Sequence, residues 1–331
     1  MEKSELILGL VHCTFLSCGE KAFLAKNLDN LESLTVLSIE AICIKVGRKI
    51  LTRAWNPEKL HNLVYQDMQM MQRFDIKYVS VLSPDYPPVL REIHDPPFVV
   101  FWRGLLPDPE RPLVGIVGTR SPSGDGALAA YRLGKEFAEA GISVISGLAR
   151  GIDAFAHKGN VESGGSSVAV LACGLDRIYP RSNVRLASRL VNEGGCLLGE
   201  YPPGDAPLQY RFPQRNRIIS GLSRAVVVAE APIKSGALIT ADFALEQGRD
   251  LFVCRDTLAS SRGEGTARLY EEGAIAIESA NDILVTWGYQ STRDFRMRFR
   301  GESGMSRSTT IGRQLAFDFR KEIFPRENGE Y

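Results

Sequence analysis

The densest group of positive charge between residues 112 and 287 is the segment Arg211-Phe212-Pro213-Gln214-Arg215-Asn216-Arg217. Guanidinium groups bind phosphate and aromatic rings stack on unpaired bases, so arginines interleaved with an aromatic residue are typical of surfaces that hold single-stranded nucleic acid. The alternative interpretation is structural. One or two of these arginines then pair with carboxylates such as Glu200 or Glu230, and we expect two of the three to be used in this way.

Four other loops combine glycine or hydroxyl residues with a cation. They contain Gly118-Thr119-Arg120, Ser146-Gly147 with Arg150, Arg181 after a Tyr-Pro pair, and Lys234-Ser235-Gly236. Small residues let the backbone approach a ligand, and the free amides at the start of a following helix can receive an anion. The GxGxxG and GxxxxGK[ST] spacings are absent from these loops. We therefore expect a phosphate-bearing ligand and no nucleotide cofactor.

Asp153 and His157 are four residues apart, on one face of an expected helix. They could form a catalytic dyad. The favoured interpretation is structural, with Asp153 serving the helix start and His157 making a local hydrogen bond. The sequence contains no HExxH, no GxSxG elbow and no Cys/His nucleophile pair, and its six cysteines lack zinc-ligand spacing. We therefore expect a binding protein, with no metal and no enzymatic activity.

These loops need a scaffold that brings them to one edge. Short apolar runs alternate with amphipathic stretches of about ten residues, and the runs are 113–117, 142–145, 168–172, 197–198, 225–229, 251–254 and 274–277. Such alternation predicts an α/β fold: an extended Rossmann-like, doubly wound, mostly parallel sheet. The loops after its strands then meet at the carboxyl edge, where ligands bind.

The composition divides the chain into four parts. Residues 1–75 have helical apolar spacing and predict a small all-helical N-terminal domain of SAM-like or helix-hairpin-helix-like type. Residues 76–111 read as a proline-rich connector that adds edge strands, and residues 112–287 as the Rossmann-like domain that carries the candidate binding loops. Residues 288–331 carry a basic stretch and predict a disordered tail.

The overall charge is nearly balanced. The 40 Lys and Arg against 39 Asp and Glu leave a formal net charge of +1 over 331 residues, so a globally basic nucleic-acid coat is absent and only a local patch remains. The chain has no apolar run long enough to cross a bilayer and no signal-peptide pattern at its start. We expect a cytoplasmic protein without membrane contact.

The order of these loops resembles the bacterial DNA-processing protein A family, also called DprA or Smf. The resemblance covers about residues 75–285 and is carried by 115–121 (GIVGTRS), 146–153 (SGLARGID) with His157, 170–180 (VLACGLDRIYP), 199–204 (GEYPPG), 212–223 (FPQRNRIISGLS) and 235–249 (SGALITADFALEQGR). It implies an extended Rossmann fold that binds single-stranded DNA without cutting it. DNA contacts are carried over to Arg120 and Arg181, with Arg215, Asn216, Arg217 and Lys234 as further pocket members.

The resemblance also implies partners and a role. The protein would form homodimers, protect incoming single strands in natural transformation, and load RecA on DNA covered by single-strand binding protein. Many family members end in a winged-helix domain, for which the roughly 45 residues after Trp287 are too few. Within that segment, the peptide from Gln314 to Phe319 (QLAFDF) resembles peptides that bind the bacterial sliding clamp. The alternative is that this peptide packs on its own domain.

Two other functions compete with DNA binding. A nucleotide-binding phosphoribohydrolase-like enzyme on a related fold would use the loop 231–240 with Glu246 as its acid, although Lys-Ser-Gly stands where that class has Gly-Gly. A pure scaffold with a vestigial pocket is the third hypothesis, under which substitution of Arg120 would leave DNA affinity unchanged.

Overall fold

A computed structural model describes residues 2–52 and 54–301 of the chain. The N-terminal part is helical, with α1 (Glu2–Val11), α2 (Cys18–Asn27), α3 (Leu31–Thr35), α4 (Ile39–Val46) and α5 (Pro57–Phe74). Its helix starts are encoded locally. Ser17, Asn30, Ser38 and Asn56 each precede a helix and accept a backbone N–H from three residues further on. The helices α4 and α5 end at Gly47 and Asp75, both in the left-handed conformation.

The rest of the chain is built on one nine-stranded sheet in the order β1-β2-β6-β5-β4-β3-β7-β8-β9. Its strands are β1 (Lys77–Ser80), β2 (Val99–Gly104), β3 (Leu113–Gly118), β4 (Ser143–Ser146), β5 (Ser167–Val170), β6 (Cys196–Gly199), β7 (Ala225–Glu230), β8 (Asp250–Cys254) and β9 (Ile275–Ile277). From β6 to β9 all neighbours are parallel. The predicted α/β, mostly parallel, doubly wound fold is confirmed.

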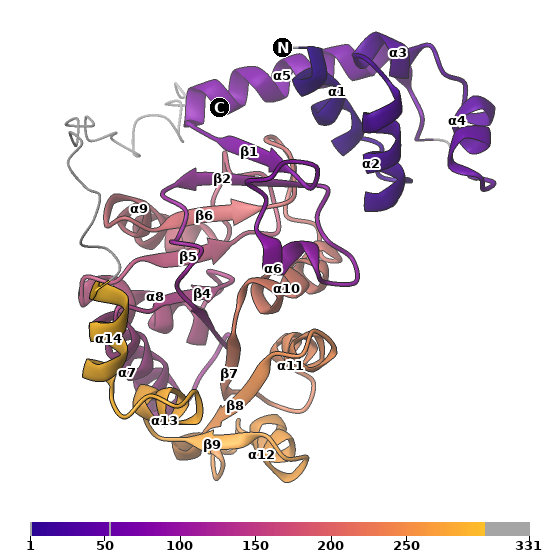
Figure 1. Cartoon of the computed structure of the whole chain (residues 1–331). Helices are drawn as coiled ribbons and strands as arrows, with labels where there is room; N and C mark the ends of the chain where they lie inside the picture. The colour runs from indigo at the N-terminus through magenta and orange to yellow at the C-terminus, as the bar shows by residue number, and fades with distance from the viewer. Residues whose placement is uncertain (1, 53, 302–331) are drawn as a thin grey trace, which may run out of the picture.

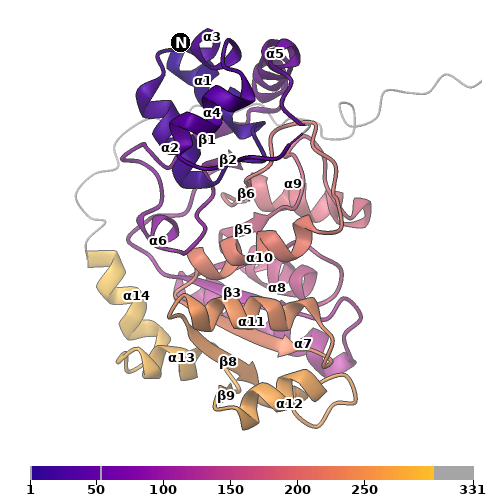
Figure 2. The ribbon, with the colours of Figure 1, turned by 90° about the vertical axis from the view of Figure 1, so that its right-hand side faces the viewer.

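Helices cover both faces of the sheet. One face carries α7 (Gly124–Ala140), α8 (Ile152–Glu162), α9 (Val184–Asn192), α13 (Ala280–Thr286) and α14 (Thr292–Gly301), and the other carries α6 (Pro88–Arg91), α10 (Arg211–Leu222), α11 (Gly236–Glu246) and α12 (Glu264–Glu271). Two short 3₁₀ turns, η1 (Arg181–Asn183) and η2 (Arg255–Thr257), follow β5 and β8. Figure 2 shows α10, α11 and α12 lying over the sheet.

Alternation along the central strands explains these two layers. In β3, Val114 and Ile116 join the core under α7, whereas Leu113 and Val117 join the core under α10 and α11. Strand β7 alternates in the same way, and its six residues are all buried. Successive side chains of a strand point to opposite faces, so an unbroken apolar run is what a sheet covered on both sides requires.

The helical part and the sheet are joined by β1 and β2. Strand β2 pairs antiparallel with both β1 and β6, so these two strands extend the parallel sheet at one edge. Figure 1 shows the N-terminal helices gathered at this β1 end, with β9 and α12 at the opposite end.

The prediction of a disordered tail from residue 288 is wrong for its first part, because Thr292–Gly301 forms the helix α14. Phe295 is only 1% exposed and packs edge-on against Tyr289, with ring centroids 4.8 Å apart. One buried aromatic residue therefore docks this basic segment beside α7. The clamp-like peptide from Gln314 to Phe319 lies outside the described residues.

No helix in the described ranges is both long and apolar enough to span a bilayer.

Candidate nucleic-acid interface

A cavity of about 690 Å³ opens at the carboxyl ends of β3 and β7. The chain runs from β3 outward to β4, β5 and β6, then returns to place β7 on the other side of β3. This reversal creates the crevice in which open α/β sheets bind ligands. The lining includes most of the predicted site residues, namely Gly118, Thr119, Arg120, Phe212, Arg215, Asn216, Lys234, Ser235 and Gly236.

Arg215 lies in the wall of the cavity and is only 5% exposed. One of its terminal nitrogens donates to the carbonyl oxygen of Gly147 at 2.9 Å and to that of Val170, and its Nε donates to Oδ1 of Asn216 at 3.3 Å. A Cβ on Gly147 would collide with the guanidinium, so only glycine allows this approach. These contacts place a cation deep in the site.

The charge of Arg215 is not matched by an ion pair with any carboxylate of the described residues. Burial lowers the pKa of Arg215, and the nearby Asp153 opposes this shift only in part. Burial also raises the pKa of Asp153, although its carboxylate accepts N–H bonds from Gly147 and Ala149 at 3.1 and 3.3 Å. Arg215 is thus held by backbone carbonyls and balanced only at longer range by Asp153, which leaves a guanidinium in the cavity wall that an anion can approach.

The mouth of the cavity combines cations with aromatic rings. Arg120 is exposed, and its guanidinium carbon lies 5.6 Å from the ring centroid of Phe212. Tyr179, 46% exposed, lies beside Phe212 with ring centroids 5.5 Å apart and planes tilted by 56°. Lys234 is also exposed and lines the other side of the cavity. The cavity lining therefore combines two exposed cations with two aromatic rings.

Polar side chains fix the start of α11 against the cavity. The Ser235 hydroxyl caps the helix by accepting the N–H of Ala237 at 3.2 Å. Asn216 donates from its side-chain amide to the carbonyl oxygen of Gly236 at 3.1 Å. The positive end of α11 is thereby held beside Lys234 and Arg215.

Arg217 does not belong to the cavity, and its assignment to the DNA site is corrected. Its guanidinium donates two hydrogen bonds to the Glu200 carboxylate, both at 2.7 Å, and also contacts the Asp95 carboxylate at 3.2 Å. Arg211 is likewise used structurally, with Asp205 at 2.8 Å and its guanidinium 4.4 Å from the ring centroid of Tyr201. The expectation that two of the three arginines serve the fold is confirmed; Glu200 is the partner of Arg217 and Asp205 that of Arg211, and neither pairs with Glu230.

Four further predicted residues lie outside the cavity lining. The Ser146 hydroxyl is fully buried and donates to the carbonyl oxygen of Ile116 at 2.6 Å, so it cannot face a ligand. Gly147 contributes indirectly, because its lack of a side chain leaves space for the Arg215 guanidinium. Arg150 is exposed in the loop before α8 and Arg181 is exposed at the start of η1, and both lie outside the lining.

The structural interpretation of Asp153 and His157 agrees with the geometry. The Asp153 carboxylate, in the first turn of α8, accepts the backbone amides of Gly147 and Ala149 in the preceding loop, whereas His157 Nδ1 lies 2.7 Å from the Ser167 hydroxyl. The two side chains have separate partners. Glu246, the acid required by a hydrolase mechanism, lies at the far end of α11 in a different pocket with Arg217 and Arg249. Among the described residues, no group of His, Cys, Asp or Glu has the arrangement of a metal site.

Sequence reasoning missed Tyr179, Asp153 and Gln209 as cavity residues. Tyr179 follows β5 and Gln209 follows β6, so the rule that loops after parallel strands converge could have found both. Asp153 was considered only as a catalytic or capping group.

Residues 77–288 match the family described as DNA recombination-mediator protein A. The chain is 42% identical over 228 residues to Protein Smf of Synechocystis, a match that covers 68% of this chain but only 57% of that protein. Its fold is similar to the X-ray structure of DNA processing protein A from Streptococcus pneumoniae, at 33% identity and a TM-score of 0.68 over 86% of this chain and 98% of that one. DNA processing protein A from Helicobacter pylori, described in terms of its single-stranded DNA binding mode, is similar at 25% identity and a TM-score of 0.55, over 69% of this chain and 97% of that one.

Proposed function

This chain belongs to the DNA recombination-mediator protein A family, and on that premise we propose that its cavity binds single-stranded DNA and that the protein mediates recombination without catalysing a reaction. The observation that carries the proposal is Arg215, a cation 5% exposed in the cavity wall without a carboxylate ion pair among the described residues. A DNA phosphate that enters the cavity would bring a negative charge to this guanidinium, which Asp153 balances only at longer range. Charge-assisted contacts of this kind are about twice as strong as neutral hydrogen bonds.

The mouth supports a single-stranded rather than a duplex ligand. Phe212 and Tyr179 offer π-faces at the opening, and unpaired bases stack on such faces with little sequence preference. Arg120 and Lys234 provide phosphate contacts on either side. A duplex keeps its bases stacked inside and cannot use the aromatic residues, so we expect selectivity for single strands.

The absence of a chemical step is part of the proposal. Asp153 is engaged by two backbone amides and His157 by Ser167, which leaves neither side chain directed at a bound phosphodiester. Release of base from AMP by the purified protein would contradict this part and favour the phosphoribohydrolase alternative.

The finer roles are proposed on family membership alone. They are homodimerisation, protection of incoming strands in natural transformation, and loading of RecA in the presence of single-strand binding protein. RecA ATP hydrolysis on DNA pre-covered by single-strand binding protein, with and without this chain, tests the loading role. A rate that does not change would contradict it.

The central experiment is fluorescence anisotropy with labelled oligo-dT against a duplex of equal length, across a salt series. The wild type should bind the single strand more tightly, with a steep salt dependence, because each neutralised phosphate releases about 0.7 counterion. Arg120→Ala should weaken binding, whereas Arg185→Ala, which removes an exposed arginine of α9 outside the cavity, should not. Equal affinity for duplex, or equal effects of the two substitutions, would overturn the assignment.

A further inference from the structure

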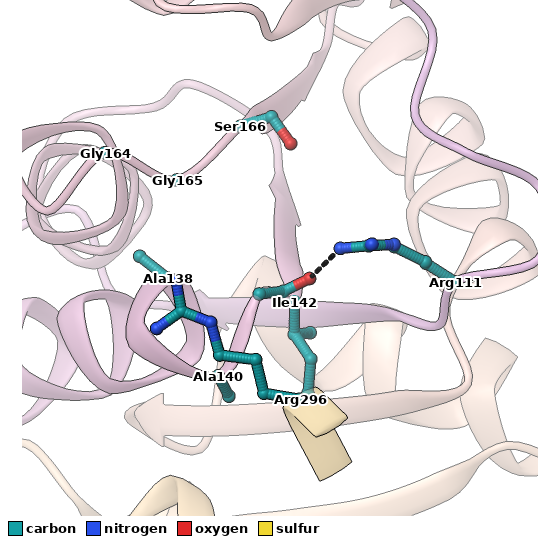
Figure 3. Close-up of a pocket in the computed structure, with 9 residues that line it drawn as sticks. Arg111, Ala138, Ala140, Ile142, Gly164, Gly165, Ser166 and Arg296 are labelled. Carbon is teal, nitrogen blue, oxygen red and sulfur yellow. Dashed lines mark hydrogen bonds between the residues drawn. The ribbon is translucent and has the colours of Figure 1, made fainter. Parts of the chain in front are cut away.

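A second cavity, of about 240 Å³, lies at the opposite edge of the sheet from the DNA cavity. It is formed where α7 and α8 end and β4 and β5 begin, and its lining includes Arg111, Arg296, Ser166, Gly141 and Gly165. Figure 3 shows Arg111 and Arg296 approaching it from two different elements, with the Arg296 guanidinium near Ala138. Within the described part of the chain, two guanidinium groups and no acidic side chain line this cavity.

Both arginines keep most of their hydrogen-bonding capacity. Arg111 donates to the carbonyl oxygen of Gly141 and Arg296 to that of Glu139, each at 3.4 Å, which is longer than an ordinary N–H···O bond. Arg111 forms a long ion pair with Asp108, at 3.7 Å, whereas Arg296 forms none with any carboxylate of the described residues. The Ser143 and Ser166 hydroxyls lie 2.7 Å apart, so one of their two protons stays available to an acceptor.

Helix capping accounts for only part of the hydrogen-bonding capacity of the two arginines. The end of α7 is closed by backbone bonds, from Gly141 N–H to Ala138 and from Ile142 N–H to Phe137. The end of α8 is closed in the same way, from Gly164 to Val161 and from Gly165 to Asn160. The carbonyl oxygens of Gly141 and Glu139 are the acceptors of Arg111 and Arg296, so each guanidinium uses one long N–H bond on the end of α7 and its other N–H groups can serve a ligand.

We propose that this second cavity holds a phosphate group of the same single-stranded DNA that enters the first cavity. The inference rests on the proposed function. Arg296 comes from α14, which lies beyond the segment 77–288 that matches the family. The docking of α14 through Phe295 brings Arg296 opposite Arg111, so the second site is completed by a segment outside the family domain.

Helix α7 sets the distance between the two sites. It begins at Gly124, shortly after Arg120, and reaches the second cavity at Ala138, Ala140 and the following Gly141. Its 17 residues span about 25 Å at 1.5 Å per residue. A stacked strand rises about 3.4 Å per nucleotide, so about seven stacked nucleotides separate the sites. A four-nucleotide strand cannot occupy both sites, and a twenty-nucleotide strand can.

The test measures the affinities of labelled dT4 and dT20 for the full chain and for R111A/R296A. The double variant should bind dT20 about tenfold more weakly, and the slope of log affinity against log salt should become shallower by about 0.7 for each phosphate that is no longer neutralised. Its affinity for dT4 should remain within about twofold of the wild type. R111K/R296K retains both charges and should keep the salt slope, and R185A serves as the matched control on α9.

Each outcome separates this proposal from the proposed function. Unchanged dT20 affinity in R111A/R296A overturns the second site while leaving the first intact. Equal losses with dT4 and dT20 also overturn it, because the short strand cannot span the two cavities. Binding of neither oligonucleotide by the wild type removes both proposals. Arg296→Ala alone removes only an exposed side chain, so it tests the site even if R111A/R296A melts at a lower temperature. This single variant should also bind dT20 more weakly than the wild type, by a smaller factor than the double variant.

Discussion

His157 of α8 gives the sharpest test of how the buried polar groups around this helix affect stability. Its ring is completely buried, and its Nδ1–H donates to the Ser167 hydroxyl, which in turn donates to the carbonyl oxygen of Val144. Its Nε2 is buried without a partner among the described residues. Burial and the neighbouring Arg215 charge lower the pKa of His157 from 6.5 to about 3. The folded protein therefore holds a neutral imidazole, unlike a catalytic base poised near neutrality.

The stability consequence follows from the direction of this shift. The unfolded chain binds the proton more tightly than the folded chain, so stability is present above pH 6.5 and is lost as the pH falls from 6.5 toward 3. Each pH unit within that window costs about 1.4 kcal/mol. Lowering the pH from 7.5 to 5 therefore costs the wild type about 2 kcal/mol through this one residue.

The perturbation is His157→Asn, whose side-chain amide can replace the Nδ1 donor but does not titrate. Urea unfolding of both proteins at pH 7.5 and pH 5 measures the difference in free energy of unfolding. The variant should be destabilised at pH 7.5 by the space it leaves, and this deficit should shrink by about 2 kcal/mol at pH 5. Shared groups such as Asp153 cancel in the comparison. A deficit that is the same at both pH values would refute the reasoning.

Three further predictions concern binding and packing. Arg120→Ala should weaken oligo-dT binding by about 1–2 kcal/mol and Phe212→Ala by about 1–3 kcal/mol, measured by anisotropy, and unchanged affinity would remove either side chain from the site. Arg217→Ala should lower the free energy of unfolding in urea by about 3–5 kcal/mol, because Glu200 is left without its bidentate partner; a loss no larger than that of the exposed Arg268→Ala would argue against it. Phe295→Ala should release α14, so that trypsin cleaves after Arg296 or Arg298 faster than in the wild type while the urea midpoint of the remaining chain barely moves. Unaltered cleavage would mean that this ring does not hold the helix.

The sheet was predictable because its strands are buried on both faces. Runs such as 113–117 and 225–229 are apolar at nearly every position, and the structure places β3 and β7 over nearly those residues. The loops after the strands then had to converge at one edge, which explains why Arg120, Phe212 and Lys234 meet at one cavity. The site prediction therefore depended on the convergence of several loops at one edge of the sheet, and no single loop would have sufficed.

Composition could not separate the cavity arginine from the structural arginines of 211–217, but the helical period of the segment could have done so. This segment opens the helix α10, in which successive residues turn by about 100°. Arg215 and Arg217 therefore project about 200° apart and cannot share one site. Arg215 lines the cavity, while Arg217 meets Glu200 and Asp95 on the other side. Treating the motif as a loop concealed this separation.

The helix α14 was not predicted because its high arginine content is a stronger sequence signal than its single buried apolar residue. Its sequence carries arginine at every second or third position, which is typical of a solvated tail. A single phenylalanine, together with Tyr289 and Trp287, supplies the apolar contact that docks it. One buried ring is too weak a periodic signal to detect in a helix of this length.

The pairing of β2 with β6 has a consequence for biosynthesis. Gly104 pairs with Cys196, about 90 residues later in the chain. At roughly 5–20 residues per second, a ribosome needs on the order of 5–20 s to deliver that partner. Throughout this interval the emerging chain presents Val99, Val100 and Phe101 on a strand whose second neighbour does not yet exist. A nascent-chain chaperone that shields apolar strand edges would have this stretch as its client, and translational pausing before residue 196 would lengthen its engagement.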